Sequence, residues 1–221
     1  MLLLKNIHKS FYSSNSRFKS FFLNQSKKNN VLNGINLTLS EKEILGLTGS
    51  NGSGKSTLLR IISGLIEKDK GEINFESFCS QNVALISSNE RSFYWRLTAY
   101  QNLIFFGSIY NLSKNEIDFK LTELSEILNI EDILEKPIMI LSSGQRKKLM
   151  LARACLKSPK LILCDEFLTN LDEQSQKNAK TFFKNYIEER KASIIWVSHS
   201  KEEVNGFCHD SVELIEGVIN H

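Results

Sequence analysis

The chain has 221 residues, of which 41% are hydrophobic and 24% charged, and its formal net charge is +3. These proportions are typical of a globular protein and exclude a disordered or fibrous chain. The small positive charge is far below the basic excess of dedicated nucleic-acid binders, so we expect no nucleic-acid partner. The most apolar stretch, 103–106, is much shorter than the about 20 residues that span a bilayer. The four cysteines lack metal-ligand spacing, which favours reduced thiols over zinc ligands.

The basic excess lies in the N-terminal section. The first 30 residues hold six lysines and arginines and no acidic residue, so the rest of the chain is mildly acidic. Residues 13–30 are rich in Ser, Asn and Lys, include three phenylalanines and show no clear period, which predicts a basic loop insert. Two interpretations stay open: a solvated loop, or an arm that contacts the inner membrane leaflet or a membrane subunit.

Strand and helix patterns then alternate along the chain. Residues 31–39 alternate apolar and polar side chains like a strand, and 44–48 form a short apolar run that ends at a glycine-rich turn. Residues 55–63 have apolar side chains at helical spacing.

A mainly helical section follows at 88–158. It includes a capping box at Ser113 and Glu116, with apolar residues spaced along one face behind it. Strand patterns return at 161–164 and 193–197, with a helix near 173–190 between them. This order favours a parallel sheet with covered faces and one helical insertion.

The glycine-rich turn fits the phosphate-loop pattern G-x-x-x-x-G-K-[ST]. Glycines let backbone amides approach phosphate oxygens, and the helix that follows directs its positive end at the anion. Lys55 is expected to reach the β- and γ-phosphates, and the Ser56 hydroxyl to hold Mg²⁺. The predicted ATP contacts are Gly49, Ser50, Asn51, Gly52, Ser53, Gly54, Lys55, Ser56 and Thr57.

Two carboxylates come directly after the strand at 161–164. Ligands of open α/β sheets bind at the carboxyl ends of the strands, where Asp165 and Glu166 stand. We expect Asp165 to be a Mg²⁺ partner, through water, and Glu166 to take a proton from the attacking water.

The segment Leu141–Gln145 (LSSGQ) completes a set of motifs that resembles the ATP-binding-cassette (ABC) ATPase family. The resemblance implies that Ser142, Gly144 and Gln145 face the γ-phosphate bound by the opposite protomer; Ser143 replaces a family glycine. In the same way, Asp172 matches a turn that contacts the partner protomer. His199 matches the histidine that responds to the γ-phosphate and is counted with Lys55 and Glu166 as catalytic.

This resemblance implies a single α/β P-loop NTPase domain with a mainly parallel sheet core, an N-terminal antiparallel β portion and a helical subdomain. The core is expected at 1–87 and 159–221, and the helical subdomain at 88–158. The implied function is ATP hydrolysis, with Mg²⁺, in a transporter that we expect to be an exporter. The implied partners are a separately encoded polytopic membrane subunit and a second ATPase subunit, at the cytoplasmic face of the membrane. The alternative is a soluble or slowly hydrolysing nucleotide-gated protein.

The sequence departs from the family pattern at one position and leaves two features open. The glutamine expected at the entry to the helical subdomain is missing from 87–89, where Asn89 could substitute. Phe11 is predicted to stack on adenine, with Tyr12 as the other possibility and a core position for both as the alternative. The aromatic residues of 91–96 fit either a docking surface for the membrane subunit or the subdomain's own core.

Overall fold

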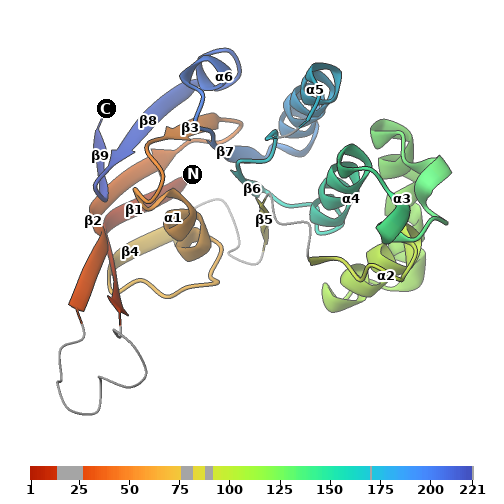
Figure 1. Ribbon diagram of the computed structural model, residues 1–221, viewed down its shortest axis with the longest axis horizontal. Coiled ribbons are helices and arrows are strands. Elements are labelled where there is room, and N and C mark those ends of the chain that lie inside the picture. Colours follow the sequence, from red (N-terminus) through yellow and green to blue (C-terminus); the bar gives the residue numbers. More distant parts are fainter. Residues whose placement is uncertain (14–26, 76–81, 88–91, 170, 221) are drawn as a thin grey trace, which may run out of the picture.

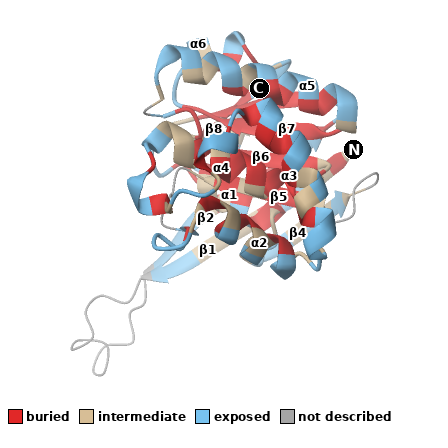
Figure 2. Ribbon diagram, turned by 90° about the vertical axis from the view of Figure 1, so that its right-hand side faces the viewer, coloured by how far each residue is buried: buried red, intermediate tan, exposed pale blue. Residues whose placement is uncertain are grey.

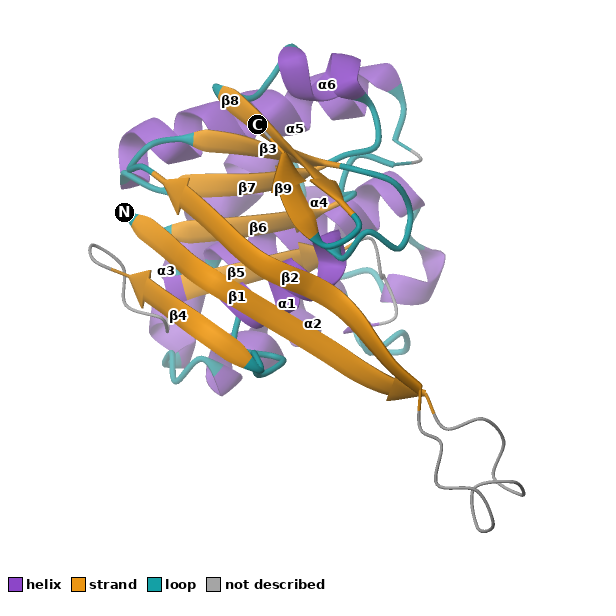
Figure 3. Cartoon of the chain, turned by 90° about the vertical axis from the view of Figure 1, so that its left-hand side faces the viewer, coloured by secondary structure: helices purple, strands orange, loops and turns teal. Residues whose placement is uncertain are grey.

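The computed structural model describes residues 1–13, 27–75, 82–87, 92–169 and 171–220. Two sheets form its frame (Figures 1 and 3). The smaller sheet is antiparallel and has the order β2 (Lys27–Leu39), β1 (Leu2–Ser13), β4 (Lys70–Phe75). The larger sheet has the order β5 (Val83–Ser87), β6 (Leu161–Asp165), β7 (Ser193–Val197), β3 (Ile44–Thr48), β8 (Asp210–Ile215), β9 (Val218–Asn220).

The parallel sheet predicted from the alternation of strands and helices is confirmed. Strands β5, β6, β7, β3 and β8 are paired in parallel, and only β9 is antiparallel to its neighbour β8. Strands β3 and β7 are buried along their whole length, as their uninterrupted apolar sequences predict. Helix α1 (Lys55–Ile62) follows β3, α5 (Glu173–Arg190) lies between β6 and β7, and α6 (Lys201–Asn205) lies between β7 and β8.

The boundaries predicted for the basic loop insert are wrong at both ends. The β1–β2 hairpin continues to the pair Ser13 and Lys27, so residues 27–30 belong to a strand, while 14–26 lie outside the described residues. The polar composition of 27–30 hid this strand because pairing with β1, rather than an apolar face, holds it in place. The side chains of Ser10 and Asn30 are hydrogen-bonded across the hairpin at 3.0 Å. Figure 3 shows the hairpin as the longest element of the smaller sheet.

Three helices dominate the section between β5 and β6: α2 (Ala99–Ile109), α3 (Lys114–Leu128) and α4 (Ser143–Cys155). The capping box predicted for α3 is present, because the Ser113 amide donates to the Glu116 carboxylate at 2.7 Å. The apolar face behind it is buried, with Ile117 fully enclosed. Figure 1 shows these helices on the side of the large sheet opposite the small sheet.

The apolar core has two parts. One fills the space between the two sheets around α1, and the other joins α2, α3, α4 and α5 to the large sheet (Figure 2). Trp196 of β7 is fully buried in the second part and packs edge-on against Phe183 and Phe207. Over the described ranges, no helix has the length and apolar character needed to cross a membrane.

Candidate nucleotide-binding site

The strand order brings the predicted site segments to one edge of the large sheet. Strands β6, β7 and β3 are consecutive neighbours, and parallel strands end at the same edge. Asp165 is in register with Val197, so the acidic pair and the segment leading to His199 leave the sheet side by side. The glycine-rich turn leaves β3 on the other side of β7.

Two glycines of the phosphate loop occupy backbone conformations that other residues rarely adopt. Gly49 has φ 141°, and a Cβ there would lie 2.3 Å from the carbonyl oxygen of Leu214 in β8. Gly54 has φ 111°, and its Cβ would lie 2.8 Å from Leu32. The pattern of glycines is therefore required by close packing of the loop against β8 and β2 as well as by access to a ligand.

Helix α1 begins without a side-chain cap. Gly54 is its N-cap residue, and the first turn contains no acidic residue. In the described part of the chain, neither the N-cap residue nor an acidic residue of the first turn caps the amides of this turn, an arrangement that favours an anion. The ammonium of Lys55 is buried beside it and donates to the carbonyls of Gly49 and Ser50 at 2.8 and 2.9 Å. Burial lowers the pKa of Lys55, while the negative charges of Glu166 and Asp165 raise it.

Asp165 and Ser56 form the candidate metal position. Burial raises the pKa of Asp165, and a hydrogen bond from the Ser56 side chain opposes that shift. The Oδ1 atom of Asp165 is buried without a hydrogen-bond partner. A buried carboxylate oxygen without a partner costs free energy, and a hard cation next to the Ser56 hydroxyl would satisfy it. The donor set therefore fits Mg²⁺.

Glu166 and His199 meet at the edge of the sheet. The Nε2 atom of His199 lies 2.5 Å from Oε1 of Glu166, and both side chains are partly exposed. Glu166 has φ 52°, a left-handed conformation that is uncommon for a non-glycine residue, and its amide donates to the Val197 carbonyl at 3.2 Å. The turn thus directs the carboxylate toward the histidine instead of along the strand.

The segment predicted to serve the opposite protomer opens helix α4. The Gln145 amide donates to the Ser142 hydroxyl at 3.2 Å, and the Gln145 side chain accepts from the Ser142 amide at 2.9 Å. This capping box fixes the start of the helix, and Ser142 and Ser143 are exposed on it. A Cβ on Gly144 would meet nothing nearer than 3.8 Å, so the helix start has room beside it.

Asp172 is the N-cap residue of α5. Its carboxylate accepts from the amide and the hydroxyl of Ser175 at 2.9 and 2.6 Å. These hydrogen bonds lower the pKa of Asp172. The residue therefore has a structural role in its own chain, beside the predicted contact with a partner.

The structure brings together one group of predicted residues and leaves a second group apart. The phosphate loop, Asp165, Glu166 and His199 lie at one edge of the sheet. Figure 1 shows helix α4 on the far side of that sheet from α1. Within one chain, Ser142, Gly144 and Gln145 therefore do not join the phosphate loop.

The aromatic residues predicted for adenine stacking lie on the surface. Phe11 and Tyr12 are 40% and 68% exposed, so the alternative that both are core residues is wrong. The ammonium of Lys9 lies 5.5 Å from the Phe11 ring centroid. At the position of the missing glutamine, Ser87 ends β5 opposite Asp165, while Asn89 lies outside the described residues.

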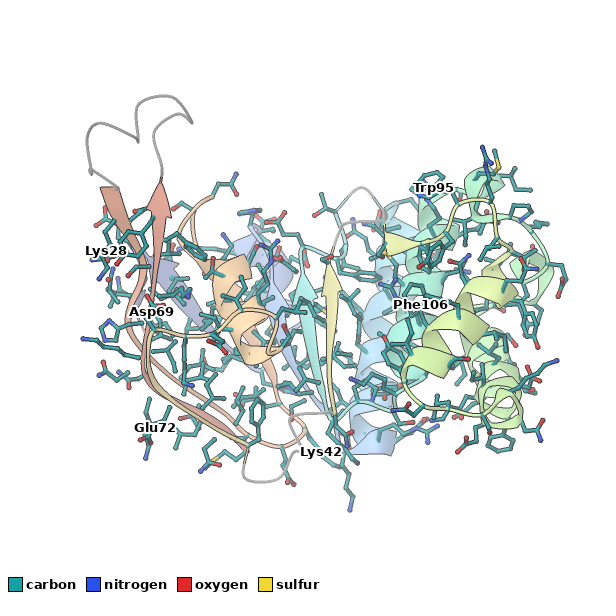
Figure 4. The ribbon with its side chains drawn as sticks, turned by 90° about the horizontal axis from the view of Figure 1, so that it is seen from below. Lys28, Lys42, Asp69, Glu72, Trp95 and Phe106 are labelled. Atoms are coloured by element: carbon teal, nitrogen blue, oxygen red, sulfur yellow. The ribbon has the colours of Figure 1, made fainter. Side chains whose placement is uncertain are left out.

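The aromatic cluster divides between core and surface: the core interpretation is confirmed for Phe93, and the docking interpretation stays a prediction for the exposed rings. Phe93 is buried and stacked by the Arg153 guanidinium at 4.8 Å. Tyr94 and Trp95 are 50% and 42% exposed, and Figure 4 shows Trp95 along the upper edge of the helical section. Together with their exposed neighbours they form an aromatic surface patch: Tyr94, Trp95, Phe105 and Met139.

The order of the strands, the phosphate loop and the acidic pair Asp165 and Glu166 together define the chain as a P-loop ATPase. Comparison with known proteins defines the family: the model described as "ABC transporter" matches residues 32–169. The chain is 33% identical to the ABC transporter ATP-binding protein NatA of Bacillus subtilis (strain 168), over 88% of this chain and 81% of NatA. It is 32% identical to the probable iron export ATP-binding protein FetA of Escherichia coli (strain K12), over 79% of this chain and 80% of FetA.

A solved structure shares the fold. The ATP-binding cassette MJ0796, determined as a dimer in a post-hydrolysis state with ADP and Pi, superposes with a TM-score of 0.83 at 22% identity, covering 100% of this chain and 97% of that one. The chain therefore belongs to the ABC transporter family, and it is an ATP-binding, ATP-hydrolysing subunit of an ABC transporter with the P-loop α/β fold expected from its sequence. Its relatives are both exporters and importers, the latter including proteins named for methionine and for sulfate or thiosulfate.

Proposed function

We propose that the chain hydrolyses Mg-ATP in a head-to-tail pair of ATPase subunits and so drives a separate membrane subunit of an exporter. The observation that carries this proposal is the contact of Glu166 with His199 at 2.5 Å, next to the buried Oδ1 of Asp165 that lacks a partner. Glu166 supplies a base, His199 a group that responds to the γ-phosphate, and Asp165 a metal ligand. All three lie at one edge of the sheet, and the two carboxylates are within electrostatic reach of Lys55.

The roles of these residues follow from their placement. The buried Lys55 ammonium and the uncapped start of α1 bind the phosphates, because both supply positive charge at the loop. Glu166 accepts a proton from the attacking water. His199, in contact with the Glu166 carboxylate, holds it in position and contacts the γ-phosphate.

Ser56 and Asp165 would hold Mg²⁺ in this site. The ion, when bound, neutralises charge on the β- and γ-phosphates during transfer. The protein contributes the buried carboxylate of Asp165, whose pKa is raised by burial. The ionised form of this carboxylate is unfavourable in the protein alone, and a bound cation would stabilise it.

A second copy or a paralogous ATPase subunit would complete each site. Helix α4, whose N-cap residue Ser142 is exposed, lies on the other side of the sheet from α1, the helix that follows the phosphate loop of its own chain. A head-to-tail arrangement gives each phosphate loop the helix start of the opposite subunit, which supplies donors to the γ-phosphate. We expect Asp172, the N-cap residue of α5, to contact that subunit.

The aromatic surface patch supports docking of a membrane subunit. It combines exposed aromatic rings with a cation, since the Arg146 guanidinium lies 5.3 Å from the Trp95 ring centroid. Aromatic residues and arginines are enriched at interface cores. We place the chain at the cytoplasmic face of the membrane through this contact, and the predicted basic arm would add to it. Export agrees with the name of FetA, a probable iron export ATP-binding protein.

Steady-state phosphate release tests the hydrolytic site. Glu166→Gln keeps the size of the side chain and removes the base, so kcat is expected to fall by about 10²- to 10⁴-fold while ATP binding persists. Glu67→Gln, at an acidic position before β4, serves as the control and should leave kcat unchanged. A Glu166→Gln protein that hydrolyses at the wild-type rate would overturn the mechanism.

Everted vesicles test the direction of transport. The chain and the membrane protein that co-purifies with it would be expressed together, and vesicles with the ATPase facing outward would be incubated with a cytosolic metabolite extract. Export predicts that ATP causes at least one compound to accumulate in the lumen, and that vesicles with Glu166→Gln do not accumulate it. Loss of a compound from a preloaded lumen when ATP is added outside would show import instead.

A further inference from the structure

A buried lysine connects the helical section to the turn that carries Glu166. Lys147 of α4 is 4% exposed, although lysine is rarely buried in proteins. Its ammonium donates to the carbonyl of Phe167 at 2.7 Å and to the carbonyl of Thr169, and it lies 5.7 Å from the Phe167 ring centroid. Both carbonyls belong to the turn that begins immediately after Glu166.

The turn itself is short and closed by its own backbone. The Thr169 amide donates to the Glu166 carbonyl at 3.3 Å, and the Leu171 amide to the Leu168 carbonyl at 3.1 Å. Its carbonyls at 167 and 169 are left for an outside donor, and Lys147 supplies both hydrogen bonds. A charged donor to a buried carbonyl makes a stronger bond than a neutral one, so the ammonium fixes the conformation of the turn.

Packing between α4 and the turn is incomplete around this lysine. Gly144 lies one helical turn before Lys147 on the same face, and a Cβ on it would be 3.8 Å from Leu171. A cavity of about 280 Å³ opens between α4 and α5; among the residues that line it are Gly144, Lys147, Phe167, Leu171, Ser175 and Ala179. Apolar side chains of α4 and of the turn share one buried core, and the hydrogen bonds of Lys147 add a direct polar link from the helix to the backbone that follows Glu166.

We propose that Lys147 is a positioning residue that couples the two ATP sites of the pair. This inference rests on the proposed function, because it requires the head-to-tail arrangement. In that arrangement α4 completes the site of the opposite subunit through Ser142 and Gly144, while Glu166 acts in the subunit's own site. The Lys147 ammonium holds the two elements together, so closure of one site on ATP positions the base of the other.

The test measures cooperativity in the full-length chain. Initial rates of phosphate release against ATP concentration give kcat, KM and the Hill coefficient for the wild type, Lys147→Met, Lys147→Arg and Lys148→Met. The last is the matched control: Lys148 is the next residue of the same helix, and its ammonium donates at 3.2 Å to the carbonyl of Asn129, within the helical section. Binding of a fluorescent ATP analogue is measured separately.

We expect a wild-type Hill coefficient above 1 that falls to about 1 in Lys147→Met, with kcat reduced about tenfold and binding of the analogue unchanged within about twofold. Lys147→Arg should restore most of the cooperativity, because a guanidinium can donate to both carbonyls. A purely structural lysine would alter the melting temperature but leave the Hill coefficient unchanged. Should Lys147→Met fail to fold, Lys147→Gln takes its place with the same expected loss of cooperativity.

Three outcomes would overturn the proposal: a Hill coefficient of 1 in the wild type, wild-type cooperativity in Lys147→Met, or the same loss in Lys148→Met. Each of them leaves the proposed hydrolysis intact as long as the wild type releases phosphate. Absence of phosphate release in the wild type would instead reject the proposed function, so the two failures are distinguishable.

Discussion

The first glycine of the phosphate loop offers a quantitative test of how the loop is built. Gly49→Ala would place a methyl group 2.3 Å from the Leu214 carbonyl oxygen and 3.0 Å from the Ser53 hydroxyl, on a backbone with φ 141°. Gly52→Ala is the matched comparison, because it lies in the same loop with φ 82° and nothing within 4 Å of its Cβ. Both substitutions add one methyl group, so they differ only in local conformation and space.

The expected losses of stability can be worked out separately. At Gly52 an alanine in the left-handed region costs about 1–2 kcal/mol. The reduced entropy of the unfolded chain returns about 0.4–1 kcal/mol of that cost, for a net loss of about 1 kcal/mol. At Gly49 the strained backbone costs up to about 3 kcal/mol. Overlap with a backbone oxygen that cannot rotate away adds about 1–3 kcal/mol. We therefore expect Gly49→Ala to be less stable than Gly52→Ala by about 3 kcal/mol.

Thermal unfolding followed by circular dichroism, without nucleotide, measures this difference. For a domain of this size, 3 kcal/mol corresponds to roughly 6–12 °C in Tm. Urea unfolding gives the same comparison as a free energy, provided that the slope is unchanged. Equal melting temperatures for the two variants would refute the reasoning, because they would mean that the loop is free to move away from β8.

Three further predictions concern the site and the surface. His199→Ala should lower kcat about 10²-fold with little change in the Kd for ATP, measured by phosphate release and equilibrium binding. An unchanged kcat would show that His199 takes no part in the chemical step. Asp165→Asn should abolish hydrolysis yet raise the free energy of unfolding by about 1 kcal/mol at pH 7. Burial raises the pKa of Asp165 from its ordinary value of 3.8, so the wild-type protein loses stability as pH rises above that value and the carboxyl group ionises. The stability gained in Asp165→Asn should therefore vanish below about pH 4, where the wild-type carboxyl group is protonated. A lower Tm for Asp165→Asn than for the wild type at pH 7 would contradict this expectation. Trp95→Ala should weaken capture of the membrane subunit about tenfold or more while the circular dichroism spectrum stays unchanged. Equal capture by the variant and the wild type would show that the membrane subunit docks on another surface.

Local sequence patterns predicted the elements that depend on local physics. The phosphate loop, the acidic strand end and the capping box at Ser113 each follow from a few neighbouring residues, because backbone conformation and capping are short-range effects. The aromatic cluster could be assigned only in part. Whether Phe93 or Trp95 is buried depends on where α2 and Arg153 lie, and this information is spread over distant parts of the chain.

The contact of Glu166 with His199 shows where sequence reasoning needs the topology. Each residue follows a recognisable strand, yet nothing in either segment states that β6 and β7 are neighbours. The order β6-β7-β3 supplies that fact, and it places base, histidine and phosphate loop at consecutive strand ends. The composition of the segments therefore identified the chemistry, and the sheet order determined which groups can act together.

Lys147 presents the opposite problem, because its local sequence is misleading. It stands in the run Arg146-Lys147-Lys148, which has the appearance of a solvated basic helix face. Helical geometry rotates successive residues by about 100°, so one member of such a run can point inward while its neighbours stay at the surface. The inward position is stabilised because the turn after β6 presents two carbonyls to the ammonium. The role of Lys147 therefore depends on the carbonyl of Phe167, twenty residues away, and the local sequence pattern does not reveal this contact.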